Sequence, residues 1–176
     1  MMSTGFAMVG PRAGDQVAVL GAPTKDEASL AAEIAKTTGL NGRTLVVDVG
    51  PEARKRVESA AAKAGSLVEF EWAPVTMLPL GDEQFDVTVI NRQLNSLQGL
   101  NRQACCQEAL RVTKTRGRVL VIEPMGRPGL FGLLPGATPG LSPAEIVASL
   151  TAVGAAAIRV LAETDGAVYV EGRKPA

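Results

Sequence analysis

Five polar residues stand at the ends of hydrophobic runs that are typical of buried β-strands: Asp48, Asn91, Arg92, Asn95 and Glu123. Carboxylates and amides at such positions can hold the hydroxyl and amino groups of a bound ligand. The sequence contains no histidine, which excludes Ser-His-Asp triads, acid–base catalysis by histidine and the common catalytic zinc sites. The pattern predicts a site that binds and orients a ligand, without a metal and without an identifiable catalytic residue.

The overall composition excludes several classes of partner. The 176 residues include 18 Lys and Arg and 18 Asp and Glu, so the formal net charge is zero. Nucleic acids and anionic membranes bind clustered Lys and Arg, so we expect neither as a partner. Cys105 and Cys106 are adjacent on a predicted helix and form no redox motif. Because no hydrophobic run is long enough for a signal peptide or a membrane span, we expect a cytoplasmic protein.

Hydrophobic periodicity predicts strands that alternate with helices. Strands are expected at residues 17–20, 44–49, 67–72, 85–90, 118–122, 158–161 and 168–170. Helices are expected at residues 24–39, 51–65, 101–114 and 142–154. Thr24 and Glu27 form a capping box at the start of the first helix, and Pro51 is expected at the first position of the second. Asp165-Gly166 is typical of a hairpin turn between the last two strands.

This order predicts an α/β fold, a Rossmann-like doubly wound three-layer sandwich with a mostly parallel sheet and a C-terminal antiparallel hairpin. We expect residues 1–14 to be a short N-terminal extension and residues 15–174 to form a single domain. In such sheets ligands bind beyond the carboxyl ends of the strands, where the strand order reverses. The predicted strand ends bring together residues 21–24, 48–50, 74–75, 91–95 and 123.

Three segments at this edge, in this order, resemble class I S-adenosylmethionine (SAM) methyltransferases of the ubiquinone-biosynthesis-like branch. The family's second-strand motif resembles residues 46–53, VVDVGPEA. Its segment leading into the fourth strand resembles residues 78–97, LPLGDEQFDVTVINRQLNSL. Its helix and fifth strand resemble residues 106–124, CQEALRVTKTRGRVLVIEP. The resemblance extends over residues 15–174 and implies a methyltransferase-like domain that uses SAM.

The resemblance also implies roles for the residues at the strand ends. Asp48 corresponds to the acidic residue that holds the ribose hydroxyls of SAM; the alternative is a carboxylate that caps the following helix. The other expected cofactor contacts are Gly21, Ala22, Val49, Val75 and Asn91. The residues expected to face the substrate or line the cleft are Arg92, Asn95 and Glu123.

The predicted cofactor loop departs from the family pattern. After the first strand the family has Gly-x-Gly-x-Gly, whereas this sequence has GAPTK from Gly21, so only the first glycine remains. Val19 and Pro74 stand where the family has acidic residues for the amino end and the adenine of SAM. Pro23 fixes its own φ and lacks an N–H donor. Of three polar anchors for SAM, one remains.

Two main hypotheses follow. In the first, the protein is a divergent SAM-dependent methyltransferase of an unidentified small molecule, because an already activated acceptor needs only positioning. In the second, it is a catalytically inactive methyltransferase-like domain, a pseudoenzyme that serves as an interaction or regulatory subunit. The hydrophobic segment from Leu130 to Leu134 is then expected to form a homo- or hetero-oligomer interface, with a lid as the alternative. A nucleotide- or NAD-binding domain is a third hypothesis, but its G-x-G-x-x-G fingerprint is absent.

Overall fold

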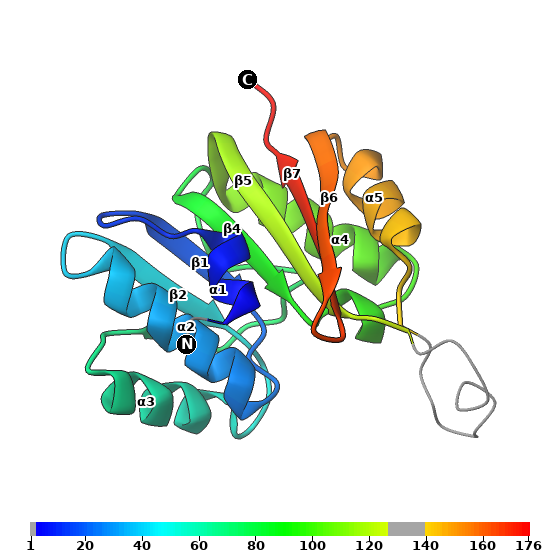
Figure 1. The fold of residues 1–176 in the computed structure, drawn as a ribbon. Helices are drawn as coiled ribbons and strands as arrows, with labels where there is room; N and C mark the ends of the chain where they lie inside the picture. Colours follow the sequence, from blue (N-terminus) through cyan, green and yellow to red (C-terminus); the bar gives the residue numbers. More distant parts are fainter. Residues whose placement is uncertain (1–2, 127–139) are drawn as a thin grey trace.

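A seven-stranded sheet forms the centre of the computed structural model, which describes residues 3–126 and 140–176 (Figure 1). Its strands are β1 (Gln16–Leu20), β2 (Arg43–Val47), β3 (Glu69–Glu71), β4 (Phe85–Asn91), β5 (Thr113–Pro124), β6 (Ala156–Thr164) and β7 (Ala167–Arg173). The order across the sheet is β3-β2-β1-β4-β5-β7-β6. The first five strands are parallel, whereas β7 runs antiparallel to β5 and β6. The predicted doubly wound fold with a C-terminal antiparallel hairpin is confirmed.

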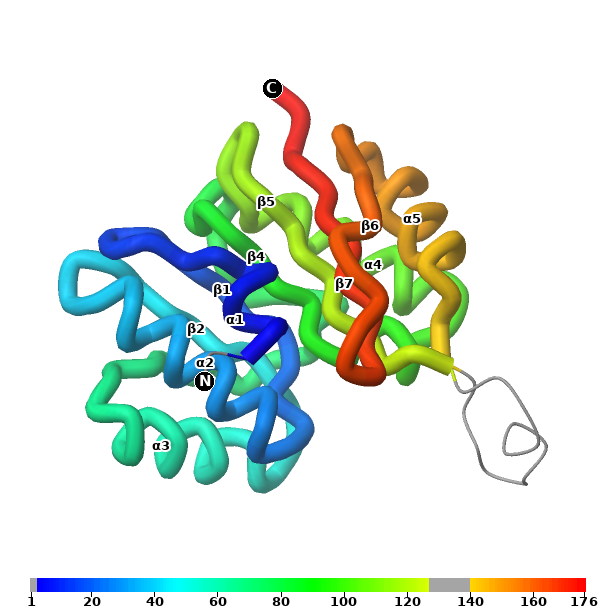
Figure 2. The backbone as a smooth tube through the Cα atoms, in the orientation of Figure 1, coloured from blue at the N-terminus to red at the C-terminus, as the bar shows by residue number. Residues whose placement is uncertain are grey.

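Helices cover both faces of the sheet (Figures 1 and 2). On one face lie α1 (Thr4–Val9), α2 (Lys25–Thr38) and α3 (Ala53–Ala64). On the other lie α4 (Leu100–Val112) and α5 (Pro143–Ala152), and the short 3-10 helix η1 (Leu94–Ser96) precedes α4. No helix within residues 3–126 and 140–176 has both the length and the hydrophobicity needed to span a membrane.

Strand β1 shows why both faces must be covered. Val17 and Val19 belong to the hydrophobic cluster under α2, and Ala18 and Leu20 belong to the cluster under α4 and α5. Side chains alternate between the two faces of a strand. A strand that is hydrophobic at every position is therefore stable only between two layers of helices.

The starts of α2 and α3 show how far local sequence signals decide the helices. Thr24 and Glu27 form the predicted capping box, and the helix ends before Gly39. The second helix, α3, begins at Ala53, and Glu52 precedes it without a side-chain cap. The expectation that Pro51 occupies the first helical position is wrong, because the chain makes a turn at Pro51 before the helix starts.

Helix α1 is not among the predicted elements. Its hydrophobic side chains Phe6 and Val9 are buried against the sheet. Two guanidinium nitrogens of Arg118, on β5, donate to the carbonyl oxygens of Met8 and Val9 at 3.0 and 2.9 Å. A partner from a distant strand therefore holds this short helix, whose six residues are too few for stability in isolation.

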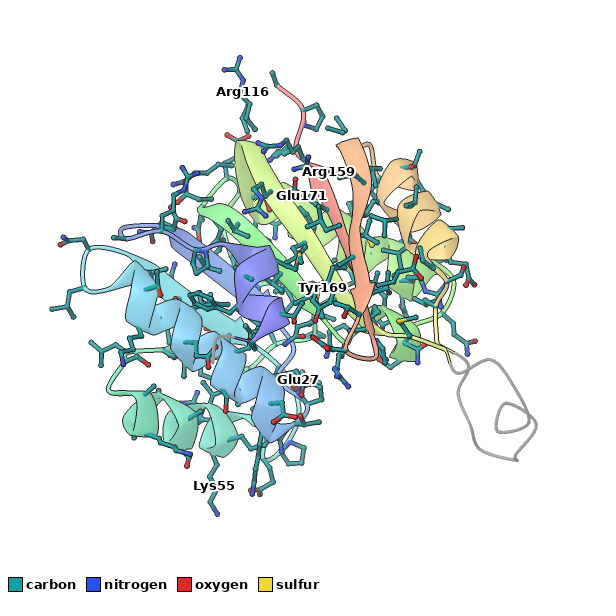
Figure 3. All side chains as sticks on the ribbon, viewed as in Figure 1. Glu27, Lys55, Arg116, Arg159, Tyr169 and Glu171 are labelled. Atoms are coloured by element: carbon teal, nitrogen blue, oxygen red, sulfur yellow. The ribbon has the colours of Figure 1, made fainter. Side chains whose placement is uncertain are left out.

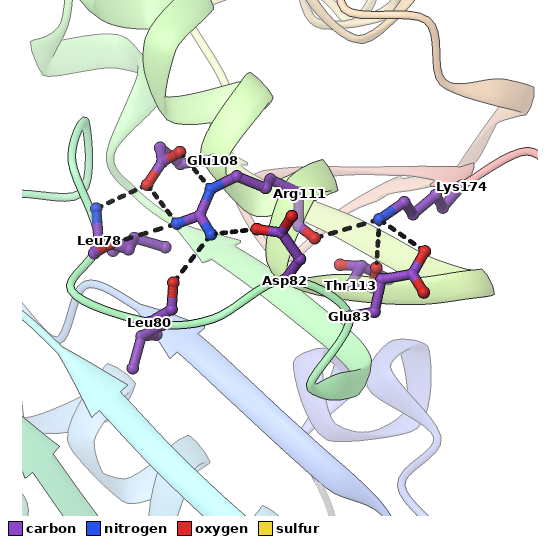
Figure 4. A network of polar contacts seen from close by, with 8 residues as sticks. All are labelled: Leu78, Leu80, Asp82, Glu83, Glu108, Arg111, Thr113 and Lys174. Atoms are coloured by element: carbon purple, nitrogen blue, oxygen red, sulfur yellow. Dashed lines mark hydrogen bonds and ion pairs between the residues drawn. The ribbon is translucent and has the colours of Figure 1, made fainter.

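A network around Arg111 fixes the loop between β3 and β4 to helix α4 (Figure 4). The guanidinium of Arg111 pairs with Glu108 and Asp82, each at 2.7 Å. It also donates to the carbonyl oxygens of Leu80 and Leu78, at 2.8 and 3.2 Å. Its hydrogen bond to Glu108 lowers the pKa of that carboxyl below its ordinary value. The loop that leads into β4 is thus held by charged hydrogen bonds as well as by packing.

Candidate cofactor site

The strand order reverses between β1 and β4. From β1 the chain proceeds outward to β2 and β3, and it then returns to form β4 on the other side of β1. Leu20 lies beside Ile90 in the parallel pairing of β1 with β4. The residues that follow them, Gly21 and Asn91, therefore reach the same edge of the sheet. Open α/β sheets bind their ligands at such a reversal, so the site is built from the loops after β1, β2, β4 and β5.

The carboxylate of Asp48 joins the loops after β1 and β2. It is 8% exposed, and its Oδ2 accepts a hydrogen bond from the N–H of Ala22 at 2.7 Å. Its Oδ1 accepts from the N–H of Gly50 at 2.6 Å. Each carboxylate oxygen can accept about two hydrogen bonds, so each keeps one acceptor position for a ligand hydroxyl. The two N–H groups fix the direction in which these positions point.

Hydrophobic side chains at the ends of β2 and β3 differ in their exposure. Val49 is 52% exposed, whereas Val75 is buried in the hydrophobic core beside Leu78. The strand expected at residues 67–72 would include Trp72, but in the structure Trp72 follows the end of β3 and is 69% exposed. The carbonyl oxygen of Glu71 accepts a hydrogen bond from the N–H of Asp48 at 3.3 Å. Trp72 therefore lies next to the Asp48 loop, where an aromatic ring can contact a ligand.

Three consecutive residues at the end of β4 reach across the strand reversal, and we term residues 91–93 the bridging segment. The Nδ2 of Asn91 donates to the carbonyl oxygen of Gly21 at 3.2 Å. The Nε of Arg92 pairs with the Oε1 of Glu27, in the first turn of α2, at 2.7 Å. The side chain of Gln93 lies over Gly21, where an added Cβ would be only 2.1 Å from its Nε2. Sequence reasoning singled out Asn91 and Arg92 but not Gln93, whose role depends on contact with Gly21.

Backbone conformation also marks this segment. Arg92 has a φ of 54°, in the left-handed region that non-glycine residues seldom adopt. Its N–H donates to the carbonyl oxygen of Ile122 on β5 at 2.8 Å. On the opposite loop Gly21 has a φ of 100°, so the one glycine retained from the family pattern meets a conformational requirement. Glu27, the partner of Arg92, lies at the start of α2 (Figure 3).

The carboxylate of Glu123 fixes the chain just beyond the bridging segment. It is fully buried, and its two oxygens accept from the backbone N–H groups of Leu94 and Asn95 at 2.7 and 3.3 Å. Burial raises the pKa of Glu123 to about 7, although these N–H groups and the nearby charge of Arg92 act in the opposite direction. Glu123 thus positions η1, and Asn95 contacts the Glu123 carboxylate through its backbone N–H.

The comparison with protein families identifies the family of this chain. Residues 27–121, more than half of the chain, match the model of a methyltransferase domain. The chain belongs to the class I SAM-dependent methyltransferase family. The match runs from the start of α2 to the middle of β5, and it contains every strand end of the site except those of β1 and β5. Membership in this family implies that the protein binds SAM.

Solved structures with the same fold include methyltransferases and a cyclase. A SAM-dependent methyltransferase from Aquifex aeolicus has a TM-score of 0.74 at 20% identity, over 96% of this chain and 86% of that one. The YcgJ protein from Bacillus subtilis has a TM-score of 0.73 at 16% identity, over 97% and 96%. The cyclase SpnF has a TM-score of 0.72 at 16% identity, over 97% and 78%. A search by sequence found no match among curated proteins. At these identities the likenesses show the fold, which does not fix the reaction.

The residues of the site fit the two ends of SAM differently. At the ribose end, Asp48 offers two oriented acceptor positions. At the methionine end, the N–H of Ala22 is already bound to Asp48, Pro23 has none, and the side chain of Gln93 covers Gly21. Among the described residues, the side-chain amide of Gln93 donates only to carbonyl oxygens of its own segment, at 3.3 and 3.4 Å. The Gln93 side chain thus lies where the site would have to open for a ligand that extends over Gly21.

The expected absence of a metal was a separate prediction from sequence. Within the two described ranges, 3–126 and 140–176, no group of three or more Cys, Asp and Glu side chains is arranged to hold a metal ion. The acidic residues of the site are instead bound to backbone N–H groups or to Arg92.

Proposed function

We propose that this protein is a SAM-dependent methyltransferase of a small molecule, and that SAM lies across the carboxyl ends of β1 and β2 with its ribose on Asp48. The observation that carries the proposal is the Asp48 carboxylate, which is nearly buried, oriented by two backbone N–H groups and able to accept two more hydrogen bonds. The order of the motifs along the chain supports a place in the ubiquinone-biosynthesis-like branch.

The residues of the chain would then divide the binding of SAM among them. Asp48 would hold the ribose hydroxyls, and the exposed surfaces of Val49 and Trp72 would contact the adenine. When bound, SAM supplies an electrophilic methyl group. Because Glu123 is buried and bound to two backbone N–H groups, its role is to position the β4–α4 loop. The chain contributes orientation and exclusion of water rather than a strong base, which suits an acceptor that is already nucleophilic.

A second candidate function is a methyltransferase-like domain without catalysis that serves as an interaction or regulatory subunit. The bridging segment favours it, because Asn91, Arg92 and Gln93 all make contacts across the strand reversal, where the cofactor would bind. The segment from Leu130 to Leu134, expected to form an oligomer interface or a lid, lies outside the described residues. An oligomer through this segment stays a prediction that native mass spectrometry can test.

Calorimetric titration with SAM and S-adenosylhomocysteine tests the proposed function. Wild-type protein is expected to bind both, and Asp48→Asn is expected to weaken binding by about tenfold or more, since a hydrogen bond to a charged group contributes about 1.5–3 kcal/mol. Asn keeps the shape of the side chain and removes the charge. Asp26→Asn, an exposed change in the first turn of α2, serves as the matched control. A folded wild-type protein that binds neither ligand would contradict the proposal.

A further inference from the structure

We propose that the bridging segment selects ligands by the group attached to the 5′ carbon of the nucleoside. A nucleoside with a small 5′ group binds at Asp48 while Gln93 stays over Gly21. The amino-acid tail of SAM or S-adenosylhomocysteine enters only after the Gln93 side chain has turned away. This inference rests on the proposed function, since it assigns the ribose to Asp48.

The sheet order fixes where a tail must run. Asp48 follows β2, and β1 lies between β2 and β4. The exposed Trp72 follows β3, which lies on the opposite side of β2 from β1; an adenine on Trp72 leaves the β1 and β4 side for the 5′ substituent. A substituent that extends from the ribose toward β4 therefore passes over the end of β1, and the residue at that end is Gly21.

The space over Gly21 is already filled. A Cβ on Gly21 would lie 2.1 Å from the Nε2 of Gln93, 2.6 Å from its Cδ and 2.6 Å from the backbone carbonyl oxygen of Asn91. These separations are far shorter than the contact distance of about 3.5–4.0 Å between non-bonded carbon atoms. A ligand group and the Gln93 amide therefore cannot occupy this space together. Adenosine, which ends at a hydroxyl, has no tail to place there.

The movable part of the bridging segment is the side chain of Gln93, and its backbone is fixed. The N–H of Arg92 is bonded to Ile122, and the side chains of Asn91 and Arg92 are bonded to Gly21 and Glu27. The Gln93 amide makes only two long bonds, to carbonyl oxygens of its own segment. The carbonyl oxygen of Asn91, also close to Gly21, belongs to the fixed backbone, so the Gln93 amide is the part of the obstruction that a side-chain rotation removes. The cost of this rotation appears as a lower affinity for ligands that need the open form.

The fluorescence of Trp72 provides a readout that needs no enzymatic activity. It is the single tryptophan of the sequence, it is largely exposed, and it follows β3 beside the Asp48 loop. Wild-type protein and Gln93→Ala are titrated with adenosine and with S-adenosylhomocysteine. We expect Gln93→Ala to bind S-adenosylhomocysteine about tenfold more tightly and adenosine equally well, because only the first ligand needs the open form. Gln98→Ala, an exposed change outside the bridging segment, should alter neither affinity.

Three results would overturn the inference. If S-adenosylhomocysteine binds the wild type and Gln93→Ala with equal affinity, the proposed function stands and the selection by Gln93 fails. If Gln93→Ala increases the affinity for adenosine as much as the affinity for S-adenosylhomocysteine, Gln93 acts on the ribose end of the ligand and not on its tail. Absence of binding by both ligands to every folded variant refutes the proposed function together with this inference, so the two failures are distinguishable.

Discussion

Replacement of Glu123 by Gln is expected to flatten the pH dependence of the free energy of unfolding around neutrality. Burial raises the pKa of Glu123 from its ordinary value of 4.5 to about 7 in the folded protein. The folded state therefore holds a proton that the unfolded state has lost, and stability falls as the pH rises between these two values. The favourable contribution is complete below the unfolded pKa and is lost once the pH exceeds the folded pKa. From roughly pH 5.5 to pH 8 the loss amounts to about 2 kcal/mol.

Few other side chains compete in this range. The sequence has no histidine, and the described carboxyls of Asp86, Glu108 and Glu171 have pKa values below their ordinary ones. Their contributions change at more acidic pH, where they stabilise the fold less as they gain protons. The slope near neutrality therefore reports chiefly on Glu123.

Urea denaturation followed by circular dichroism at a series of pH values measures this slope. We expect the wild type to lose about 2 kcal/mol from roughly pH 5.5 to pH 8, and Glu123→Gln to lose less than half of that. Glu163→Gln, an exposed change on β6, should keep the wild-type slope. If Glu123→Gln and the wild type show the same slope, the carboxyl does not titrate near neutrality, and the argument from its burial is refuted.

Two further predictions concern groups outside the site. Glu171 is buried between Arg118 and Arg159 on neighbouring strands (Figure 3), and although burial raises its pKa, the two guanidiniums lower it below the ordinary value. Arg118→Met should lower the free energy of unfolding, measured by urea denaturation, by about 3–5 kcal/mol. Arg159→Met removes a mostly exposed partner and should lower it by about 1 kcal/mol or less. Equal losses in the two variants would contradict this account. Burial also raises the pKa of Cys106 to about 12 and raises that of Cys105. Neither thiol should react with iodoacetamide in the native protein and both should react after unfolding, so rapid native alkylation would show that α4 opens.

Most of the fold could be predicted because its signals are local. The capping box of Thr24 and Glu27 acts between residues one helical turn apart, and it appears where it was expected. Asp165-Gly166 forms the expected hairpin turn, and both residues have positive φ, of 53° and 71°. The strand expected at residues 44–49 placed Asp48 near the end of β2, and in the structure β2 ends at Val47, so that Asp48 follows it directly. In each case the physical cause lies within a few residues of the feature.

Other features were missed because they depend on distant partners. Helix α1 has too few residues to be stable alone and is held by Arg118 from β5. The expected edge strand at residues 67–72 is shorter in the fold, which leaves Trp72 exposed.

The sequence by itself determined the alternation of strands and helices and the residues at the strand ends, because hydrophobic periodicity and helix caps are short-range properties. Only the tertiary structure decided which side chains lie across the carboxyl ends of the strands, where a ligand is expected. Gln93 carries no sequence signal, and it matters because the parallel pairing of β1 with β4 brings its side chain over Gly21. The pairing of Arg92 with Glu27 and the burial of Glu123 likewise arise between strand ends that are far apart in the chain. Contacts between such ends depend on the packing of the whole sheet, which no local pattern of residues encodes.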